Sequence, residues 1–305
     1  MQITTYYKNA ATNHSTDETS PLIPLLRGEG NDVFTTTLNP ILLSLGPITI
    51  RWYGLFLAIG VTLAILIIAK LFKERKYSVD LALNFGIWLT IGGLAGARLG
   101  EILFYEPIYY FSHPLEIIFI NHGGLSSHGM AIGLLVTFFW FTKTKSPLGE
   151  GRPVVAGRSV LSWKKILDIL IIPVPLLAAF IRIGNFFNSE IVGKPTGLPW
   201  GVKFPLYEIN PASRHPSQLY ESLISLSLFI SIYFIYKKYS PKLPQLFLTN
   251  LFLLLYFSSR FLIEFLKADY QTSLGLTMGQ LLSVPFIIFS IFWFVKIKFR
   301  QDKTY

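Results

Sequence analysis

Seven apolar segments, each close to the length that crosses a lipid bilayer, constrain the fold of this chain more than any other feature. A helix needs about 20 apolar residues to span the hydrocarbon core. Only 14% of the 305 residues are charged and 51% are hydrophobic, which is typical of an integral membrane protein. The sequence therefore predicts an all-α, seven-transmembrane-helix bundle. The predicted spans are residues 52–72, 81–104, 124–142, 166–187, 217–236, 245–266 and 279–296.

The distribution of basic residues orients these spans. Most of the 27 Lys and Arg residues follow the first, third, fifth and seventh spans. The positive-inside rule places those loops in the cytoplasm, so the N-terminus is expected outside and the C-terminus inside. The net charge of +10 is then a feature of membrane topology. Because no basic stripe accompanies a nucleic-acid-binding motif, we expect no nucleic-acid partner.

Three domains are expected along the chain. Residues 1–37 are polar, contain no apolar core of signal-peptide length, and are predicted to form a flexible exterior tail. Residues 38–299 form the transmembrane domain, and residues 300–305 a cytoplasmic tail. Segment 106–123, between the second and third spans, is interrupted by prolines. It is typical of an interfacial or re-entrant element rather than a further crossing.

Five arginines depart from the charge bias, because they lie near the outer ends of the spans. A charge at membrane depth is costly and usually lines a cavity or a reaction site. Any one of these side chains could instead extend to lipid phosphates. Their polar neighbours, however, favour a site for an anionic lipid head group. The five are Arg51, Arg98, Arg182, Arg214 and Arg260.

The densest polar cluster, residues 122–129, precedes the third span. Gly123 and Gly124 permit a turn that other residues resist, and either of the two serines that follow can cap the next helix. His128 then lies in the first helical turn, where the helix dipole favours the neutral imidazole that a general base requires. A capping or interfacial role is the alternative for this histidine.

Polar residues also mark the outer ends of the fourth and fifth spans. Arg182, Asn185 and Asn188 recur every three residues, which places them on adjoining parts of one helical face. An arginine fork beside amides suits a phosphate or a carboxylate, although helix termination would also explain Asn188. Arg214 precedes a helix N-terminus, a natural anion site. Glu221, about a turn deeper, requires a cationic partner such as an arginine.

Other residues are expected to support the structure. Arg260 and Glu264 have the i, i+4 spacing of a helical ion pair, and Arg98 is interpreted similarly. Ser217 and Gln218 are expected to satisfy the free backbone amides at the start of the fifth span. Because no HExxH or GxSxG motif is present, we expect no metal and no Ser-His-Asp triad.

Seven motifs follow one another between residues 40 and 297, and together they resemble the prolipoprotein diacylglyceryl transferases of bacterial inner membranes. Three features depart from the family pattern: His122 replaces a commonly acidic residue, the outer loop 194–213 is short, and residues 1–37 have no counterpart. The short loop leaves Tyr207 as a candidate for a family tyrosine. The motifs are Arg51–Gly54, Gly96–Gly100 with Phe104-Tyr105, Gly123–Gly129, Arg182–Glu190 with Gly193, Arg214–Glu221, Arg260–Glu264 and Met278–Pro285.

The resemblance implies transfer of the diacylglyceryl group of phosphatidylglycerol to the lipobox cysteine of a preprolipoprotein, with release of glycerol phosphate. It places the protein in the bacterial inner (plasma) membrane, with its active site towards the outer face and no cofactor. Such a reaction needs cations for the leaving phosphate and a base for the thiol. We expect Arg182 and Arg214 to hold the phosphate and His128 to accept the proton. The other expected site residues are Asn185, Glu190, Glu221 and Tyr53 for substrate binding, with Arg98, Arg260, Glu264, Gly123, Gly124 and Gly193 as support.

Two other functions also use arginines within a helical bundle. A transporter of anionic solutes would place them near the midplane and show inverted repeats or broken helices. A lipid-binding scaffold would need no base or carboxylates beside the arginines. The position of the polar residues at one face, together with His128 and Glu190, favours the transferase over both.

Overall fold

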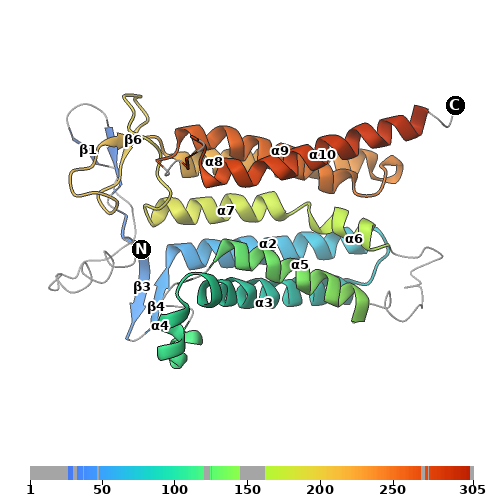
Figure 1. Cartoon of the computed structure of the whole chain (residues 1–305), viewed down its shortest axis with the longest axis horizontal. Helices are drawn as coiled ribbons and strands as arrows, with labels where there is room; N and C mark the ends of the chain where they lie inside the picture. The colour runs from blue at the N-terminus through green and yellow to red at the C-terminus, as the bar shows by residue number, and fades with distance from the viewer. Residues whose placement is uncertain are drawn as a thin grey trace.

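The computed structural model describes residues 27–29, 33–36, 38–46, 48–119, 124, 126–144, 162–268, 272–273 and 275–302. Long helices run side by side, with short strands and loops at one end (Figure 1). Within the described residues, six helical stretches are long and apolar enough to cross a membrane. The prediction of a membrane protein built from several spanning helices is therefore confirmed. The stretches are α2 (Trp52–Glu74), α3 (Val79–Phe104), α6 (Trp163–Leu170) with α7 (Val174–Phe187), α8 (Ser217–Tyr239), α9 (Phe247–Ile263) with η4 (Glu264–Leu266), and α10 (Met278–Asp302) over residues 278–297.

Helix α5 (Ser127–Thr144), which matches the third predicted span, packs closely against α3. Glycines form the contact: a Cβ on Gly129 would overlap the carbonyl oxygen of Gly96, and one on Gly100 would lie 2.7 Å from the Cα of Gly129. Small residues let helix backbones approach in this way. The start of α5, which carries His128, is thus held directly against the C-terminal half of α3.

The fourth predicted span is divided into α6 and α7 by a short turn at residues 171–173. Pro173 and Pro175 explain the break, because proline lacks an N–H and disfavours helical geometry in the preceding residue. The break positions Asp168 of α6 to accept hydrogen bonds from the backbone N–H groups of Leu246 (2.6 Å) and Thr249 (2.9 Å). Asp168 thereby caps α9 from a neighbouring helix.

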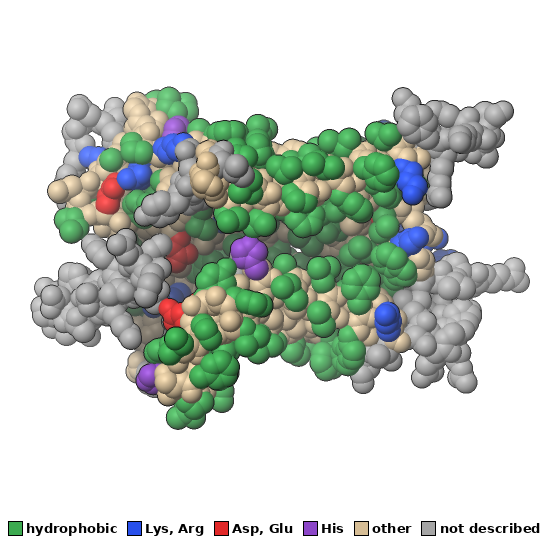
Figure 2. Space-filling model, viewed as in Figure 1, with side chains coloured by type: hydrophobic (Ala, Val, Ile, Leu, Met, Phe, Trp, Pro, Cys, Tyr) green, Lys and Arg blue, Asp and Glu red, His purple; other side chains and the backbone are tan. Residues whose placement is uncertain are grey.

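The apolar core lies at one end of the bundle. It combines the ends of α2, α5 and α8, the beginnings of α3 and α9, and the buried face of α6 with the turn after it. Its fully buried residues include Phe72, Phe85, Ile166, Ile172 and Ile232. Figure 2 shows hydrophobic side chains over the outside of the helices, with Lys and Arg near the two ends. The buried polar side chains of α7, α8 and η4 collect at the other end, where the strands lie.

Short strands cover the polar end. A four-stranded sheet has the order β1-β2-β5-β6, with β2 and β5 parallel and the other pairs antiparallel. A separate hairpin, β3-β4, leads into α2. Strands β1 and β2 lie in the segment that the sequence assigns to a flexible tail, so part of that segment pairs with the outer loop. The strands are β1 (Arg27–Glu29), β2 (Val33–Thr35), β3 (Ile41–Leu45), β4 (Ile48–Arg51), β5 (Val202–Lys203) and β6 (Ser213–Arg214).

The segment after α3 forms two short helices, α4 (Pro107–Ser112) and η1 (Pro114–Ile117), which are too short for a crossing. Figure 1 shows α4 projecting from the bundle near its strand-covered end. Ile108 is 86% exposed and Leu115 74% exposed. A short element with outward apolar side chains suits the membrane interface that the sequence predicts for it.

Candidate active site

The end of α7 carries an arginine that two hydrogen bonds connect to a carboxylate. Arg182 donates from Nη1 to Oδ1 of Asn185 (3.2 Å), and Nδ2 of Asn185 donates to Oε2 of Glu190 (3.1 Å). Nδ2 of Asn188 donates to the other oxygen of Glu190 (3.2 Å). Burial raises the pKa of Glu190, and the two asparagine hydrogen bonds oppose that rise. The three-residue spacing therefore builds one connected polar face, as predicted.

Ion pairs extend this face to α8 and α9. Nε of Arg182 lies 2.6 Å from Glu221, and Nζ of Lys267 lies 2.8 Å from the other oxygen of that carboxylate. Lys267 also lies 3.2 Å from Glu264, whose Oε1 is 3.7 Å from Nη2 of Arg260. Glu221 thus has the arginine partner that its depth requires. Lys267, only 2% exposed, is central to this array but was missed from the sequence. Its i+3 spacing from Glu264 was the available signal.

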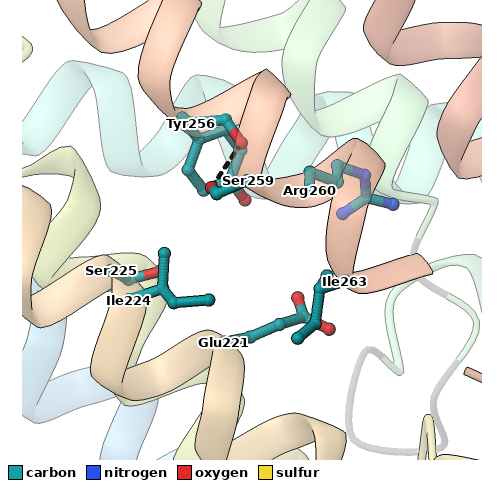
Figure 3. Close-up of a pocket in the computed structure, with 7 residues that line it drawn as sticks. All are labelled: Glu221, Ile224, Ser225, Tyr256, Ser259, Arg260 and Ile263. Carbon is teal, nitrogen blue, oxygen red and sulfur yellow. Dashed lines mark hydrogen bonds between the residues drawn. The ribbon is translucent and has the colours of Figure 1, made fainter. Parts of the chain in front are cut away.

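A small pocket opens between α8 and α9 beside these ion pairs. In Figure 3, Glu221 extends from α8, whereas Tyr256, Ser259 and Arg260 extend from α9. Ionic and hydroxyl groups therefore share the pocket with apolar walls, which suits an amphiphile whose head group is charged. The lining residues are Glu221, Ile224, Ser225, Tyr256, Ser259, Arg260 and Ile263.

Arg182 and Arg260 retain donor groups for a ligand. Within the part of the chain that the structure describes, the contacts of Arg182 use Nε and Nη1 and leave Nη2 available. Arg260 contacts only Glu264 there, and 3.7 Å exceeds a hydrogen-bond length. The side chain of Arg260 is 30% exposed and lines the pocket. Both guanidiniums can therefore bind an anion without losing a short ion pair.

Arg214 is in a different situation, because each of its three guanidinium nitrogens already donates a hydrogen bond. Nε and Nη2 donate to the two oxygens of Glu208 (2.9 and 2.7 Å), and Nη1 donates to the carbonyl of Gly193 (3.2 Å). The guanidinium also lies over the ring of Tyr207, 5.0 Å from its centroid. The Arg214 hydrogen bonds hold the pKa of Glu208 below its usual value. Glu208 was not singled out from the sequence, because it pairs with Arg214 across a loop turn.

His128 belongs to a second group of contacts, on α3 and α5. It is the second residue of α5, and Ser126 caps that helix by accepting a hydrogen bond from the N–H of Gly129 (3.2 Å). Nδ1 of His128 lies 3.3 Å from the hydroxyl of Tyr105, at the end of α3. No contact between described residues joins His128 to Arg182. The predicted first-turn position is thus observed, whereas direct contact with the arginines is not.

Arg98 supports the chain that leads into α5. Its side chain is 5% exposed and donates to the carbonyl groups of Ile117 (3.1 Å), Phe119 (3.2 Å) and Gly124 (3.0 Å). It also donates to the hydroxyl of Tyr110 (3.1 Å). Gly124 has φ +71°, and a Cβ there would lie 2.6 Å from that hydroxyl, so this position requires glycine.

The start of α8 differs from the sequence prediction. Ser217 and Gln218 do not satisfy the backbone amides of α8 in the described contacts. The hydroxyl of Ser217 donates to the carbonyl of Ile191 (2.8 Å), and Nε2 of Gln218 donates to the carbonyl of Glu190 (2.6 Å). Both side chains are fully buried. They therefore fix the turn after α7 that holds Glu190, a long-range contact that local capping rules do not foresee.

Two further predicted residues contribute by close packing. The ring of Tyr53 lies against Gly184, where a Cβ would be 2.9 Å from it. This places Tyr53 on α2 beside the polar end of α7. A Cβ on Gly193 would overlap the carbonyl of His215, so glycine lets these two segments approach. Gly123, with the histidine before it, lies outside the described residues.

The fold and this arrangement define a polytopic helical membrane protein with a cation-rich site at one end of its bundle. A family model described as prolipoprotein diacylglyceryl transferase matches residues 40–296. The chain therefore belongs to the prolipoprotein diacylglyceryl transferase family, as its motifs indicated.

Relatives that carry the name phosphatidylglycerol–prolipoprotein diacylglyceryl transferase cover most of the chain. The protein of Chloroherpeton thalassium is 40% identical over 258 residues, which are 83% of this chain and 90% of that relative. That of Bacteroides fragilis is 35% identical over 270 residues, 84% of this chain and 92% of the relative. That of Tolumonas auensis is 36% identical over 256 residues, 83% and 93% respectively.

Proposed function

We propose that this chain transfers the diacylglyceryl group of phosphatidylglycerol to the lipobox cysteine thiol of preprolipoproteins, releasing glycerol phosphate. The observation that carries the proposal is the pocket between α8 and α9, where Arg260 and the Arg182–Glu221 ion pair adjoin apolar walls. A phospholipid needs this combination, because its phosphate seeks cations and its acyl chains seek an apolar path. The names of the relatives, which specify these two substrates, support it further.

The proposal includes seven membrane spans: the six described above and α5, which is the third in chain order. Helix α5 lies against α3 through glycine contacts, so it shares the membrane depth of α3. Basic loops after α2, α5, α8 and α10 then face the cytoplasm. The strand-covered end, with the arginines, faces the outside of the bacterial inner membrane, where a preprolipoprotein presents its lipobox. The catalytic domain spans residues 38–299.

For the phosphate we propose Arg182 and Arg260. The sequence assigned the second position to Arg214, but the guanidinium of Arg214 already binds Glu208 and Gly193. Arg260 lines the pocket with donors available, and Arg182 pairs with Glu221, which also lines it, and keeps Nη2 without a described contact. Two guanidiniums on different helices can hold separate phosphate oxygens and stabilise the charge that develops as glycerol phosphate leaves. Arg214 then shapes the outer wall of the site.

We propose His128 as the base and Asn185, Glu190, Glu221 and Tyr53 as the groups that orient the substrates. The thiol proton passes to Nε2 of His128, and the thiolate attacks the diacylglyceryl carbon attached to the phosphate oxygen. A C–S bond forms as the C–O bond breaks. The bonding electrons move to the phosphate oxygen of the departing glycerol phosphate, and the imidazolium can return its proton to solvent. The acyl esters remain intact, and no cofactor is required.

The same site discriminates against the alternative functions. In the described residues, the buried ion pairs of α7, α8 and α9 lie at one end of the bundle rather than at the midplane that transporters use. A lipid-binding scaffold would need the arginines but not an exposed histidine on the adjoining helices. We therefore place group transfer ahead of transport and of lipid binding alone.

Purified protein in detergent with phosphatidylglycerol and a lipobox peptide tests the proposal by mass spectrometry. The peptide is expected to gain the mass of one diacylglyceryl group, and a Cys→Ser peptide is expected to gain none. Phosphatidylethanolamine of the same acyl composition serves as the lipid control. An unmodified cysteine peptide, under conditions in which the C. thalassium relative modifies it, would favour lipid binding or transport.

A further inference from the structure

At the neighbouring tips of α3 and α5, a tyrosine meets the histidine of the proposed site. The hydroxyl of Tyr105 lies 3.3 Å from Nδ1 of His128. Both side chains are exposed on the described surface, so substrate can reach them without a rearrangement of the core. Tyr105 belongs to the second sequence motif, and the mechanism proposed above gives it no role.

Backbone contacts fix the relative position of these two residues. The N–H of Ser126 donates to the carbonyl of Ala97 (2.9 Å), which joins the entry of α5 to α3. Gly129, next to His128, lies against Gly96 and Gly100 so closely that no Cβ fits. The N–H of Tyr105 donates to the carbonyl of Glu101 (3.0 Å), so Tyr105 still follows the axis of α3. The Tyr105–His128 distance is therefore set by the helix pair.

We infer that Tyr105 is a positioning residue for the base, an inference that rests on the proposed function. The Tyr105 hydroxyl accepts a hydrogen bond from Nδ1–H of His128, which leaves the lone pair on Nε2. In this tautomer the contact holds the ring plane and leaves Nε2 free to accept the thiol proton. A ring that carries its proton on Nε2 cannot accept another there, so a hydrogen bond from Nδ1–H to Tyr105 favours the form of His128 that can act as a base.

The contact also affects the proton-transfer step itself. When Nε2 takes the thiol proton, the positive charge spreads over both ring nitrogens, and the Nδ1–H···O contact strengthens. Tyr105 therefore acts on the rate of thiol deprotonation rather than on binding of phosphatidylglycerol. For histidines that bind a metal, loss of the orienting hydrogen-bond partner costs about 10- to 100-fold in activity, and a contact of the same kind is lost here. We expect that loss in kcat, with KM for phosphatidylglycerol within about twofold of wild type.

The test compares Tyr105→Phe with wild type on two lipobox peptides, one with cysteine and one with selenocysteine. A selenol is ionised at neutral pH and needs no base, so the variant should recover to within about threefold of wild type on that peptide. The matched control is Tyr109→Phe, in the neighbouring α4, whose ring stacks on His113 and makes no described contact with His128. It should match wild type on both peptides.

A double variant provides a second readout. Because Tyr105 acts only through His128, Tyr105→Phe added to His128→Gln should cause little further loss. An equal loss on the cysteine and selenocysteine peptides, an additive double variant, or an undiminished Tyr105→Phe enzyme would each overturn the inference and leave the transferase intact. Failure of the wild-type protein to modify either peptide would instead overturn the proposed function, and the inference with it.

Discussion

Arg182 shows how single contacts prepare a side chain for a ligand. Asn185 on its own helix and Glu221 on α8 hold two of its nitrogens, which fixes the plane of the guanidinium. The remaining Nη2 edge is then presented without further loss of side-chain freedom. Arg214 shows the opposite case, because Glu208 and the carbonyl of Gly193 together bind all three of its nitrogens, which indicates a structural role. The number of occupied donors, rather than the residue type, separates these two arginines.

This difference predicts a ranking of arginine variants in the peptide-modification assay. Arg260→Lys removes a fork that faces the pocket and should lower kcat/KM by roughly 100-fold. Arg214→Lys loses the paired hydrogen bonds to Glu208 but removes no donor from the pocket, so it should cost less than about tenfold. Circular dichroism and size-exclusion profiles control for folding. A larger loss in Arg214→Lys than in Arg260→Lys would indicate that Arg214, rather than Arg260, binds the phosphate.

Lys267 predicts a stability effect, because it neutralises two buried carboxylates. In Lys267→Met, Glu221 and Glu264 lose a shared cation, and the free energy of unfolding should fall by about 3–5 kcal/mol. Unfolding in mixed detergent micelles, followed by circular dichroism, measures this. Lys194→Met, at an exposed lysine of the outer loop, is the control and should change it by less than about 0.5 kcal/mol. Equal stability of the two variants would contradict the role of Lys267.

At the scale of elements, the polar end is assembled by helix pairs of different kinds. Helices α3 and α5 meet through glycine backbones, whereas α7 and α8 meet through an ion pair and a buried amide. The first kind tolerates no added volume, and the second tolerates no lost charge. His128 and Arg182 therefore depend on separate interfaces, and in the proposed reaction the substrates have to bring the two together.

Gly129→Ala tests the glycine interface. The new Cβ overlaps the carbonyl of Gly96, so α3 and α5 must separate, which should cost about 1–3 kcal/mol of stability and reduce transfer. Thermal unfolding in detergent measures the first effect and the peptide assay the second. Gly54→Ala, at a helical glycine with open space around it, should leave stability unchanged or slightly higher. Similar behaviour of the two variants would argue against a tight α3–α5 contact.

The outer loop should become labile in acid. Hydrogen bonds from Arg214 lower the pKa of Glu208, so the folded state binds fewer protons than the unfolded state as the pH falls through the usual glutamate range. The stabilisation is present above the ordinary pKa and is lost as the pH falls through the depressed value. Pepsin cleavage within residues 193–213 should therefore rise in that window. Glu208→Gln should be cleaved rapidly without this pH dependence. If cleavage of the wild-type protein did not change with pH, the Arg214–Glu208 pair would not be what stabilises the loop.

For the whole molecule, the sequence predicts the helices well and their contacts poorly. Span length and charge depend on local composition, so six predicted spans reappear within a few residues of their expected ends. Pairs such as Arg182–Glu221 join different helices, and the sequence could only indicate that Glu221 needs a cation. Lys267 and Glu208 were missed because their partners are set by helix packing and loop geometry. Ser217 was misinterpreted because local capping competes with a long-range contact.

The most direct measurement uses phosphatidylglycerol labelled with oxygen-18 between the diacylglyceryl carbon and phosphorus. The lipobox peptide should gain an unlabelled diacylglyceryl group, and the released glycerol phosphate should carry the label. That result requires a thiolate attack on carbon with cleavage of the C–O bond, as proposed for the Arg182 and Arg260 site. A label retained in a lipid alcohol, or a peptide that gains no diacylglyceryl group, would contradict the account.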